Sequence, residues 1–115
     1  MEIMHAKFVL RAQEMWRAVA FWRDAFELQV RFADDEWTEL ALGEQAMLVL
    51  QRGHDGSVRA SSFSINVDDL ARAIEAVRAA GGRVVREPHH PKGRTFQLAT
   101  VVDTEGNTFR ISEGA

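Results

Sequence analysis

The sequence predicts an α+β domain made of two tandem βαβββ modules. They would form one curved mixed sheet of eight strands, with helices on the convex face and a cup on the concave face. Two observations support this. The order strand, helix, three strands occurs twice along the 115 residues, and a shift of about 55 positions brings similar residues together. The shift superposes Phe8 on Phe63, Arg17 on Arg72, Ala18 on Ala73, Arg23 on Arg78, Val30 on Val85 and Arg31 on Arg86.

The first module is predicted to span residues 1–53. Its helix opens at Gln13-Glu14, where a carboxylate suits the helix dipole. Apolar side chains then recur at helical spacing and predict a packed face made of Met15, Trp16, Val19, Trp22 and Phe26. Alternating or apolar runs predict strands over Met1–Leu10, Leu28–Phe32, Trp37–Leu42 and Ala46–Gln51.

The second module is predicted to span residues 59–115, after a linker at 53–57, within a single domain of residues 1–115. Asp68 or Asp69 caps its helix, and Gly81-Gly82 ends it. A tight turn at 103–107 joins its last two strands, because Gly106 is free to adopt positive φ. The predicted strands are Ser61–Val67, Val84 to about Pro88, Leu98–Val102 and Thr108–Ser112.

Composition limits the partners of this chain. The net charge is −3 and no basic run occurs, which argues against nucleic-acid binding. The chain has no cysteine, so it has no disulfide and no thiolate nucleophile. No signal peptide is apparent, and no window approaches the roughly 20 apolar residues of a membrane span. We therefore expect a cytoplasmic protein without nucleic-acid or membrane partners.

Three segments resemble the vicinal-oxygen-chelate superfamily, which includes glyoxalase I, bleomycin-resistance proteins, extradiol dioxygenases and fosfomycin-resistance enzymes. They are the helix segment at 17–24, Gly81-Gly82, and the turn Asp103-Thr104-Glu105-Gly106-Asn107. The chain departs from the family pattern at Thr104, where proline is usual, and at Phe26-Glu27, where Leu-Gly is usual. The second departure places a non-glycine residue where a left-handed cap is expected. The resemblance implies the glyoxalase/bleomycin-resistance fold.

In metal-dependent members, four side chains of the cup floor bind a divalent ion, and the resemblance assigns those places to Lys7, Val49, Ser62 and Arg110. None of them is a good ligand, because lysine and arginine are cations and valine has no donor atom. Sliding the register by two residues would bring His5 to the first place, yet one histidine does not make a site. We therefore expect no metal and no other cofactor.

Strand alternation predicts which side chains line the cup. Lys7 and Arg110 would meet near its floor and bind a carboxylate or phosphate; alternatively, they pair with Glu39 in a structural network. Glu39 is a weak candidate for a general base, which would need a raised pKa, or it is an ion-pair partner. The predicted ligand-binding residues are His5, Lys7, Trp37, Glu39, Met47, Val49, Gln51, Ser62, Ser64, Thr100 and Arg110.

Two further side-chain groups have alternative interpretations. Trp37 and Met47 either contact a flat apolar ligand or only cover their sheet. His89-His90 would lie in a loop over the cup, because adjacent strand residues point in opposite directions and do not chelate together.

The predicted function is metal-independent binding of a small molecule, with a drug or metabolite, such as an anionic one, sequestered in the cup. The resemblance to bleomycin-resistance proteins implies antibiotic resistance as one biological role and a homodimer with ligands between the subunits. The alternative is an enzyme, either a glyoxalase-like lyase or a dioxygenase, which would need a metal or catalysis by Glu39 or His5.

Overall fold

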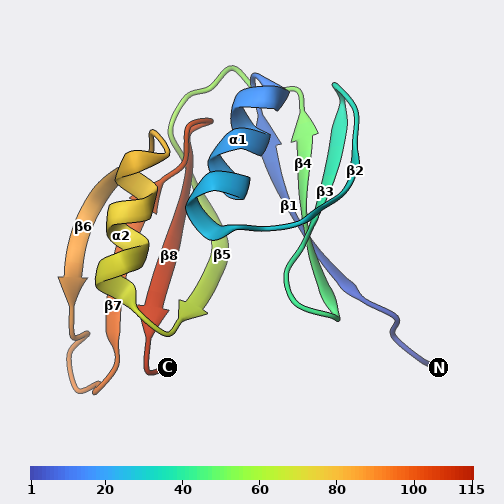
Figure 1. Ribbon diagram of the computed structural model, residues 1–115. Coiled ribbons are helices and arrows are strands. Elements are labelled where there is room, and N and C mark those ends of the chain that lie inside the picture. The colour runs from blue at the N-terminus through green and yellow to red at the C-terminus, as the bar shows by residue number, and fades with distance from the viewer.

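The computed structural model describes all residues, 1–115, as two layers, with both helices on the same side of the strands (Figure 1). Neither helix has the length and apolar character needed to cross a membrane. The elements are β1 (Ala6–Ala12), α1 (Met15–Phe26), β2 (Val30–Ala33), β3 (Trp37–Ala41), β4 (Ala46–Arg52), β5 (Arg59–Val67), α2 (Leu70–Ala79), β6 (Arg83–His89), β7 (Gln97–Val102) and β8 (Asn107–Glu113).

The strand order confirms the duplicated βαβββ architecture. The first sheet has the order β1-β4-β3-β2, and the second has the equivalent order β5-β8-β7-β6. In each sheet the first strand pairs in parallel with the last one, and the remaining pairs are antiparallel. The predicted fold class is therefore correct, and every predicted strand exists, with small shifts at all ends except the start of β1.

One detail of the prediction is wrong, because the chain forms two four-stranded sheets and not one sheet of eight strands. The edge strands β1 and β5 approach each other through side chains, with the rings of Phe8 and Phe63 5.5 Å apart. Strand β5 is also irregular between Ala60 and Ser64, which removes the regular edge that a neighbouring strand would need. The two sheets are therefore joined by packing and not by a hydrogen-bonded ladder.

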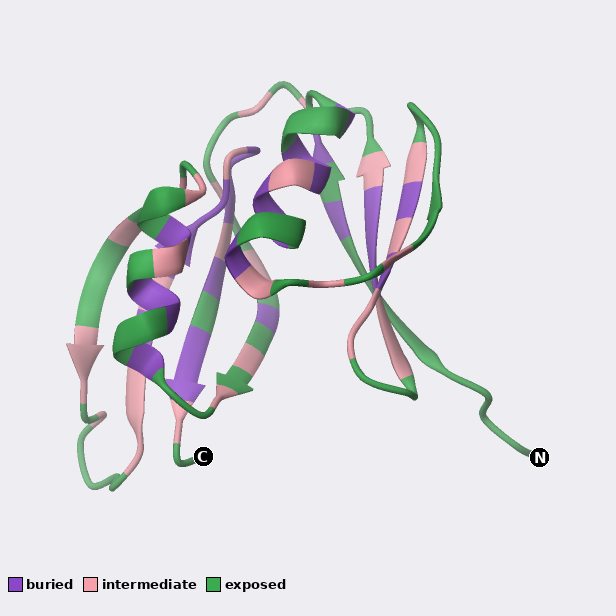
Figure 2. Ribbon diagram, in the orientation of Figure 1, coloured by how far each residue is buried: buried purple, intermediate pink, exposed green.

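Helix α1 supplies the aromatic core that holds the two sheets together. The ring of Trp22, which is fully buried, lies 4.7 Å from Phe109 of β8 and 5.9 Å from Phe63 of β5. Figure 2 shows the buried faces of both helices turned toward the strands. Trp16 corrects the prediction of a packed residue, because it lies away from this face and is 54% exposed.

The helix ends follow their predicted capping chemistry. The Glu14 carboxylate accepts hydrogen bonds from the backbone N–H groups of Trp16 and Arg17, and Asp69 caps α2 through the N–H of Arg72. Glu27 adopts the left-handed conformation, with φ of 56°, at the end of α1. The prediction that a non-glycine residue occupies a left-handed cap at the end of this helix is therefore confirmed. Strand β1 begins at Ala6, later than the predicted Met1, since the first five residues have no strand partner.

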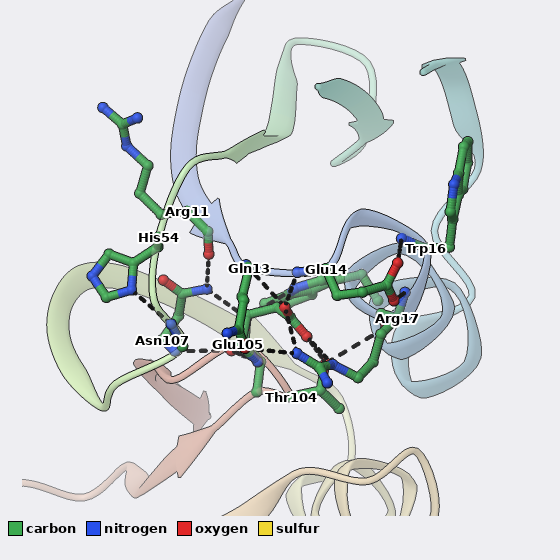
Figure 3. Close-up of polar contacts among 12 residues, drawn as sticks. Arg11, Gln13, Glu14, Trp16, Arg17, His54, Thr104, Glu105 and Asn107 are labelled. Atoms are coloured by element: carbon green, nitrogen blue, oxygen red, sulfur yellow. Dashed lines mark hydrogen bonds and ion pairs between the residues drawn. The ribbon is translucent and has the colours of Figure 1, made fainter. Parts of the chain in front are cut away.

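A buried carboxylate fastens the β7–β8 turn to the connection between β1 and α1 (Figure 3). Glu105 has no exposed surface. Its oxygens accept the backbone N–H groups of Gln13 and Glu14 at 3.0 and 2.8 Å, and the guanidinium of Arg17 at 2.7 and 3.1 Å. The Thr104 hydroxyl donates a further hydrogen bond to the same carboxylate. We refer to Gln13, Glu14, Arg17, Thr104 and Glu105 as the clasp, because these contacts tie the second module to the first.

The other residues of the β7–β8 turn are held by hydrogen bonds and close packing. Asp103 accepts hydrogen bonds from the backbone N–H groups of Glu105 and Asn107 and lies 3.3 Å from the indole nitrogen of Trp22. Burial raises the pKa of Asp103, and these hydrogen bonds only partly offset that effect. A Cβ at Gly106 would collide with the carbonyl oxygen of Ser57, so the connection at 53–57 packs against the turn instead of acting as a free linker.

The pKa of Glu105 gives the clasp a pH dependence. Burial favours the neutral acid, but the hydrogen bonds from Arg17, the Glu14 backbone and Thr104 outweigh burial and leave the pKa of the Glu105 carboxyl below its ordinary value. A carboxylate whose folded pKa is lowered adds stability above its unfolded pKa, and that stability disappears as the pH falls through the folded pKa.

We predict that Glu105→Gln lowers the free energy of unfolding by about 2–3 kcal/mol at neutral pH, because charge-assisted hydrogen bonds to a buried carboxylate are lost. The difference from the unmodified chain should shrink as the pH falls below about 4.5. Urea unfolding at a series of pH values measures both effects. Glu44→Gln, at an exposed glutamate between β3 and β4, is the control and should cost little; a pH-independent effect of Glu105→Gln would contradict the prediction.

Candidate functional site

Each sheet has a face that the helices leave uncovered, called here its open face. Strand alternation identifies it, because the intervening residues of the same strands belong to the core, for example Leu48 and Leu50 on β4, and Phe109 and Ile111 on β8. The predicted site residues divide between the two open faces. The first sheet carries Lys7, Trp37, Glu39, Met47, Val49 and Gln51; the second carries Ser62, Ser64, Thr100 and Arg110, and His5 precedes β1.

On the first open face, Lys7, Trp37 and Glu39 form a closed polar group. The ammonium of Lys7 lies 3.1 Å from the Glu39 carboxylate, and the indole N–H of Trp37 donates to the same oxygen at 3.2 Å. The ion pair reaches across β4 beside Val49, whose side chain is completely buried. The first open face is therefore occupied by its own side chains at this position.

The surroundings of Glu39 disfavour the catalytic role considered for it. The Trp37 hydrogen bond, followed by that of Lys7, lowers the pKa of the Glu39 carboxyl below its ordinary value. A general base working near neutral pH needs a raised pKa. Glu39 therefore fits the role of an ion-pair partner of Lys7. It lacks the raised pKa that a general base requires.

The predicted meeting of Lys7 and Arg110 stays a prediction, but the two side chains differ in their sheets and in their partners. Lys7 belongs to β1 of the first sheet, and its charge is paired with Glu39. Arg110 belongs to β8, the second strand of the other sheet, with β5 between it and the seam. None of the seven ion pairs of the chain involves Arg110, whose side chain is exposed. The two cations therefore stand in different environments.

Two neighbouring hollows flank the irregular part of β5. A hollow of about 470 Å³ lies on the second sheet and is lined by Ala60, Ser61, Ser62, Phe63, Ser64 and Arg110. A smaller one of about 210 Å³ lies at the seam between the sheets and is lined by Lys7, Phe8, Val9, Leu10, Ser61, Ser62 and Phe63. Ser61, Ser62 and Phe63 border both, so this short segment separates the two spaces.

The sequence shapes this segment through a serine. The Ser61 hydroxyl donates to the carbonyl of Thr108 at 2.6 Å and accepts the N–H of Phe63 at 3.3 Å. Two extra residues of β5 are thereby accommodated between the pairs Ala60–Thr108 and Ser64–Arg110. Phe63 turns into the core while Ser62 lines the hollows.

The donor set does not fit a divalent metal ion. The places implied by the family resemblance hold an ammonium paired with a carboxylate (Lys7), a buried valine (Val49), a hydroxyl (Ser62) and a guanidinium (Arg110). No group of three histidine, cysteine, aspartate or glutamate side chains gathers in a geometry that could hold a metal. The residues at these places therefore do not fit the divalent ion of the metal-dependent family members.

Arg86 was not among the predicted site residues; it lies opposite Thr100 in the ladder between β6 and β7. Strict alternation would place it on the same face as Val84, which packs against the core. One extra residue of β6 between Val84 and Arg86 reverses the alternation and carries Arg86 to the open face. The sequence signal available was its equivalence with Arg31 in the repeat, which does not report a face.

The predicted loop over the cup is only partly correct. His89 is the last residue of β6, opposite Leu98, and its Nδ1 lies 3.0 Å from the carbonyl of Glu87. His90 belongs to the β6–β7 connection, with its Nδ1 3.1 Å from the carbonyl of Phe96. Each imidazole thus has a local backbone partner.

The glyoxalase-like domain family matches residues 7–112, and the chain therefore belongs to this family of the vicinal-oxygen-chelate superfamily. The lactoylglutathione lyase of Haemophilus influenzae is 30% identical over 127 aligned positions, which cover 98% of this chain and 93% of that protein. Lactoylglutathione lyase GLX1 of Arabidopsis thaliana is 26% identical over 117 positions, 90% of this chain. The chain spans only about a third to two-fifths of the length of the plant relatives it matches.

Solved structures support the fold. A glyoxalase/bleomycin resistance protein/dioxygenase family enzyme from Burkholderia phytofirmans superposes with a TM-score of 0.77 over the full length of both chains, at 15% identity. Lactoylglutathione lyase from Agrobacterium tumefaciens gives 0.75, at 22% identity, over 95% of this chain and 92% of that one. At these identities the likeness concerns the fold and leaves the chemistry to the site.

We predict that Lys7→Met raises the pKa of Glu39 toward its ordinary value, because one of the two groups that stabilise its charge is removed while the hydrocarbon packing is kept. NMR titration of the Glu39 carboxyl carbon measures the shift. Lys92→Met, at an exposed lysine in the β6–β7 connection, is the control and should leave this pKa unchanged. An unchanged pKa in Lys7→Met would show that the ion pair is not formed in solution.

Proposed function

We propose that this chain is a small-molecule-binding protein that takes an anionic ligand without the help of a divalent metal. The observation that carries the proposal is the chemistry of the four family ligand places, where Lys7 and Arg110 are cations and Val49 is a buried hydrocarbon. Two cations would repel a divalent ion, whereas an unpaired guanidinium attracts a carboxylate or phosphate.

The second sheet supports this proposal better than the first. Arg110 lines the larger hollow together with the hydroxyl-bearing Ser62 and Ser64. These groups offer hydrogen bonds and positive charge without acid–base or nucleophilic machinery. These side chains therefore suit the binding and sequestration of a drug or metabolite. They do not suit a cationic drug, because the guanidinium of Arg110 would repel it.

The relatives favour a second candidate function. The Haemophilus influenzae relative, similar across nearly its whole length, is a lactoylglutathione lyase. For this chain, such an enzyme would be a glyoxalase-like lyase with a catalytic group or metal outside the expected places. Glu39 is disfavoured as its base, because its pKa is lowered.

One experiment separates the two candidates. We predict that purified chain treated with EDTA is stabilised against thermal unfolding by phenyl phosphate or benzoate, and not by benzylamine, because Arg110 brings an unpaired positive charge to the larger hollow. The same preparation, assayed for lactoylglutathione formation with and without added divalent metals, should be inactive. Absence of any shift with both acidic compounds, or turnover that depends on a stoichiometric divalent ion, would overturn the binding proposal in favour of the lyase.

We also predict that the protein pairs with a second copy. Apolar side chains are exposed along the start of the chain and β1, where Ile3 is 82%, Met4 70%, Phe8 45% and Val9 49% exposed. Contiguous exposed apolar residues mark interaction surfaces. Sedimentation should give a dimer for the unmodified chain and a monomer for the combined Ile3→Lys and Met4→Lys variant. A monomeric unmodified chain would contradict this.

A further inference from the structure

A row of side chains crosses the whole open face of the second sheet. Arg86 of β6 lies opposite Thr100 of β7, Thr100 lies opposite Arg110 of β8, and Arg110 lies opposite Ser64 of β5. Directly opposed residues of paired strands project on the same face. Since neighbouring strands are about 4.8 Å apart, the backbones of the two arginines are separated by about 10 Å, with Thr100 between them.

The ladder itself assigns Arg86 to the open face. Its register shifts both before and after Arg86, so the direct pairing with Thr100 is the observation that places this side chain. The neighbouring Glu87 lies on the helix side, since its carboxylate is 2.6 Å from the guanidinium of Arg78, which belongs to α2.

The two guanidinium groups have no carboxylate to neutralise them. None of the seven ion pairs of the chain involves Arg86 or Arg110. The strands β5 to β8 contain two acidic residues, Glu87 and Glu113. Glu113 accepts the N–H of Leu70 at the start of α2 and so, like Glu87, belongs to the helix side. Glu87 and Glu113 thus lie on the helix side, opposite the face that Arg86 and Arg110 share.

The charge and the hydroxyl groups select among anions. A carboxylate carries one charge and two oxygens, which one guanidinium already satisfies in a bidentate contact. A phosphate monoester carries up to two charges and three terminal oxygens. Two guanidinium groups with the hydroxyls of Thr100 and Ser64 between and beside them match that larger demand. The adjoining hollow of about 470 Å³, which Arg110 and Ser64 also line, offers space for the organic part of the ligand.

We propose that Arg86, Thr100, Arg110 and Ser64 form a binding site for the phosphate group of a small phosphate monoester. This inference rests on the proposed anion-binding function and gives it a substrate class. It also assigns a role to Arg86, which lies outside the four places that the family resemblance points to.

The test is calorimetric titration with phenyl phosphate and with benzoate as probes. Unmodified chain should bind phenyl phosphate more tightly than benzoate. Arg86→Gln and Arg110→Gln should each weaken phenyl phosphate binding at least about tenfold, because each removes charge-assisted hydrogen bonds. Arg31→Gln is the matched control, since Arg31 is the repeat equivalent of Arg86 on β2 of the first sheet, and it should bind like the unmodified chain.

The outcomes separate this inference from the proposed function. Binding of benzoate that is tighter than that of phenyl phosphate, or an unchanged affinity in Arg86→Gln, would overturn the phosphate site while leaving an anion-binding protein. Failure of both probes to bind would overturn the proposed function as well. Both arginines are exposed, so the variants should keep the thermal unfolding midpoint of the unmodified chain, which verifies that a loss of affinity is not a loss of fold.

Discussion

The arrangement of the two modules depends on the hydrogen bonds and the ion pair of the buried Glu105 carboxylate. A charge without solvent contact is tolerated only when hydrogen bonds and an opposite charge replace the lost water. Those partners lie about 90 residues earlier in the sequence, where Gln13, Glu14 and Arg17 mark the start of the first helix. The carboxylate thus fixes the start of helix α1 next to the β7–β8 turn, and Trp22 of the same helix packs against Phe63 and Phe109 of the second sheet.

The two halves share a topology and differ in the chemistry of their open faces. On the first sheet, Lys7 and Glu39 neutralise each other above the buried Val49. On the second sheet, Arg110 and Arg86 remain without an acidic partner. Duplication preserves the hydrophobic pattern that each sheet needs for its core, whereas the uncovered face is free to diverge because folding does not constrain it. The chemical difference between the two open faces follows from this freedom.

Membership of the glyoxalase-like family therefore says more about the scaffold than about the reaction. The scaffold places side chains from paired strands at fixed spacing on an uncovered face, which suits a metal when the donors are histidine and glutamate. The same spacing suits an anion when the side chains are arginine and serine. In this chain, the side chains Ser62, Ser64 and Arg110 are of the second kind.

The sequence by itself determined the duplicated strand–helix–strand pattern, the helix starts at Glu14 and at Asp68 or Asp69, the left-handed cap at Glu27 and the turn around Gly106. These features depend on local periodicity and local backbone chemistry, which a sequence displays directly. Only the tertiary structure decided that the sheets stay separate, that Lys7 pairs with Glu39 and that Arg86 faces outward. An irregular ladder reverses the alternation of side chains, and partners distant in sequence compete for each charge, so no local pattern encodes these outcomes.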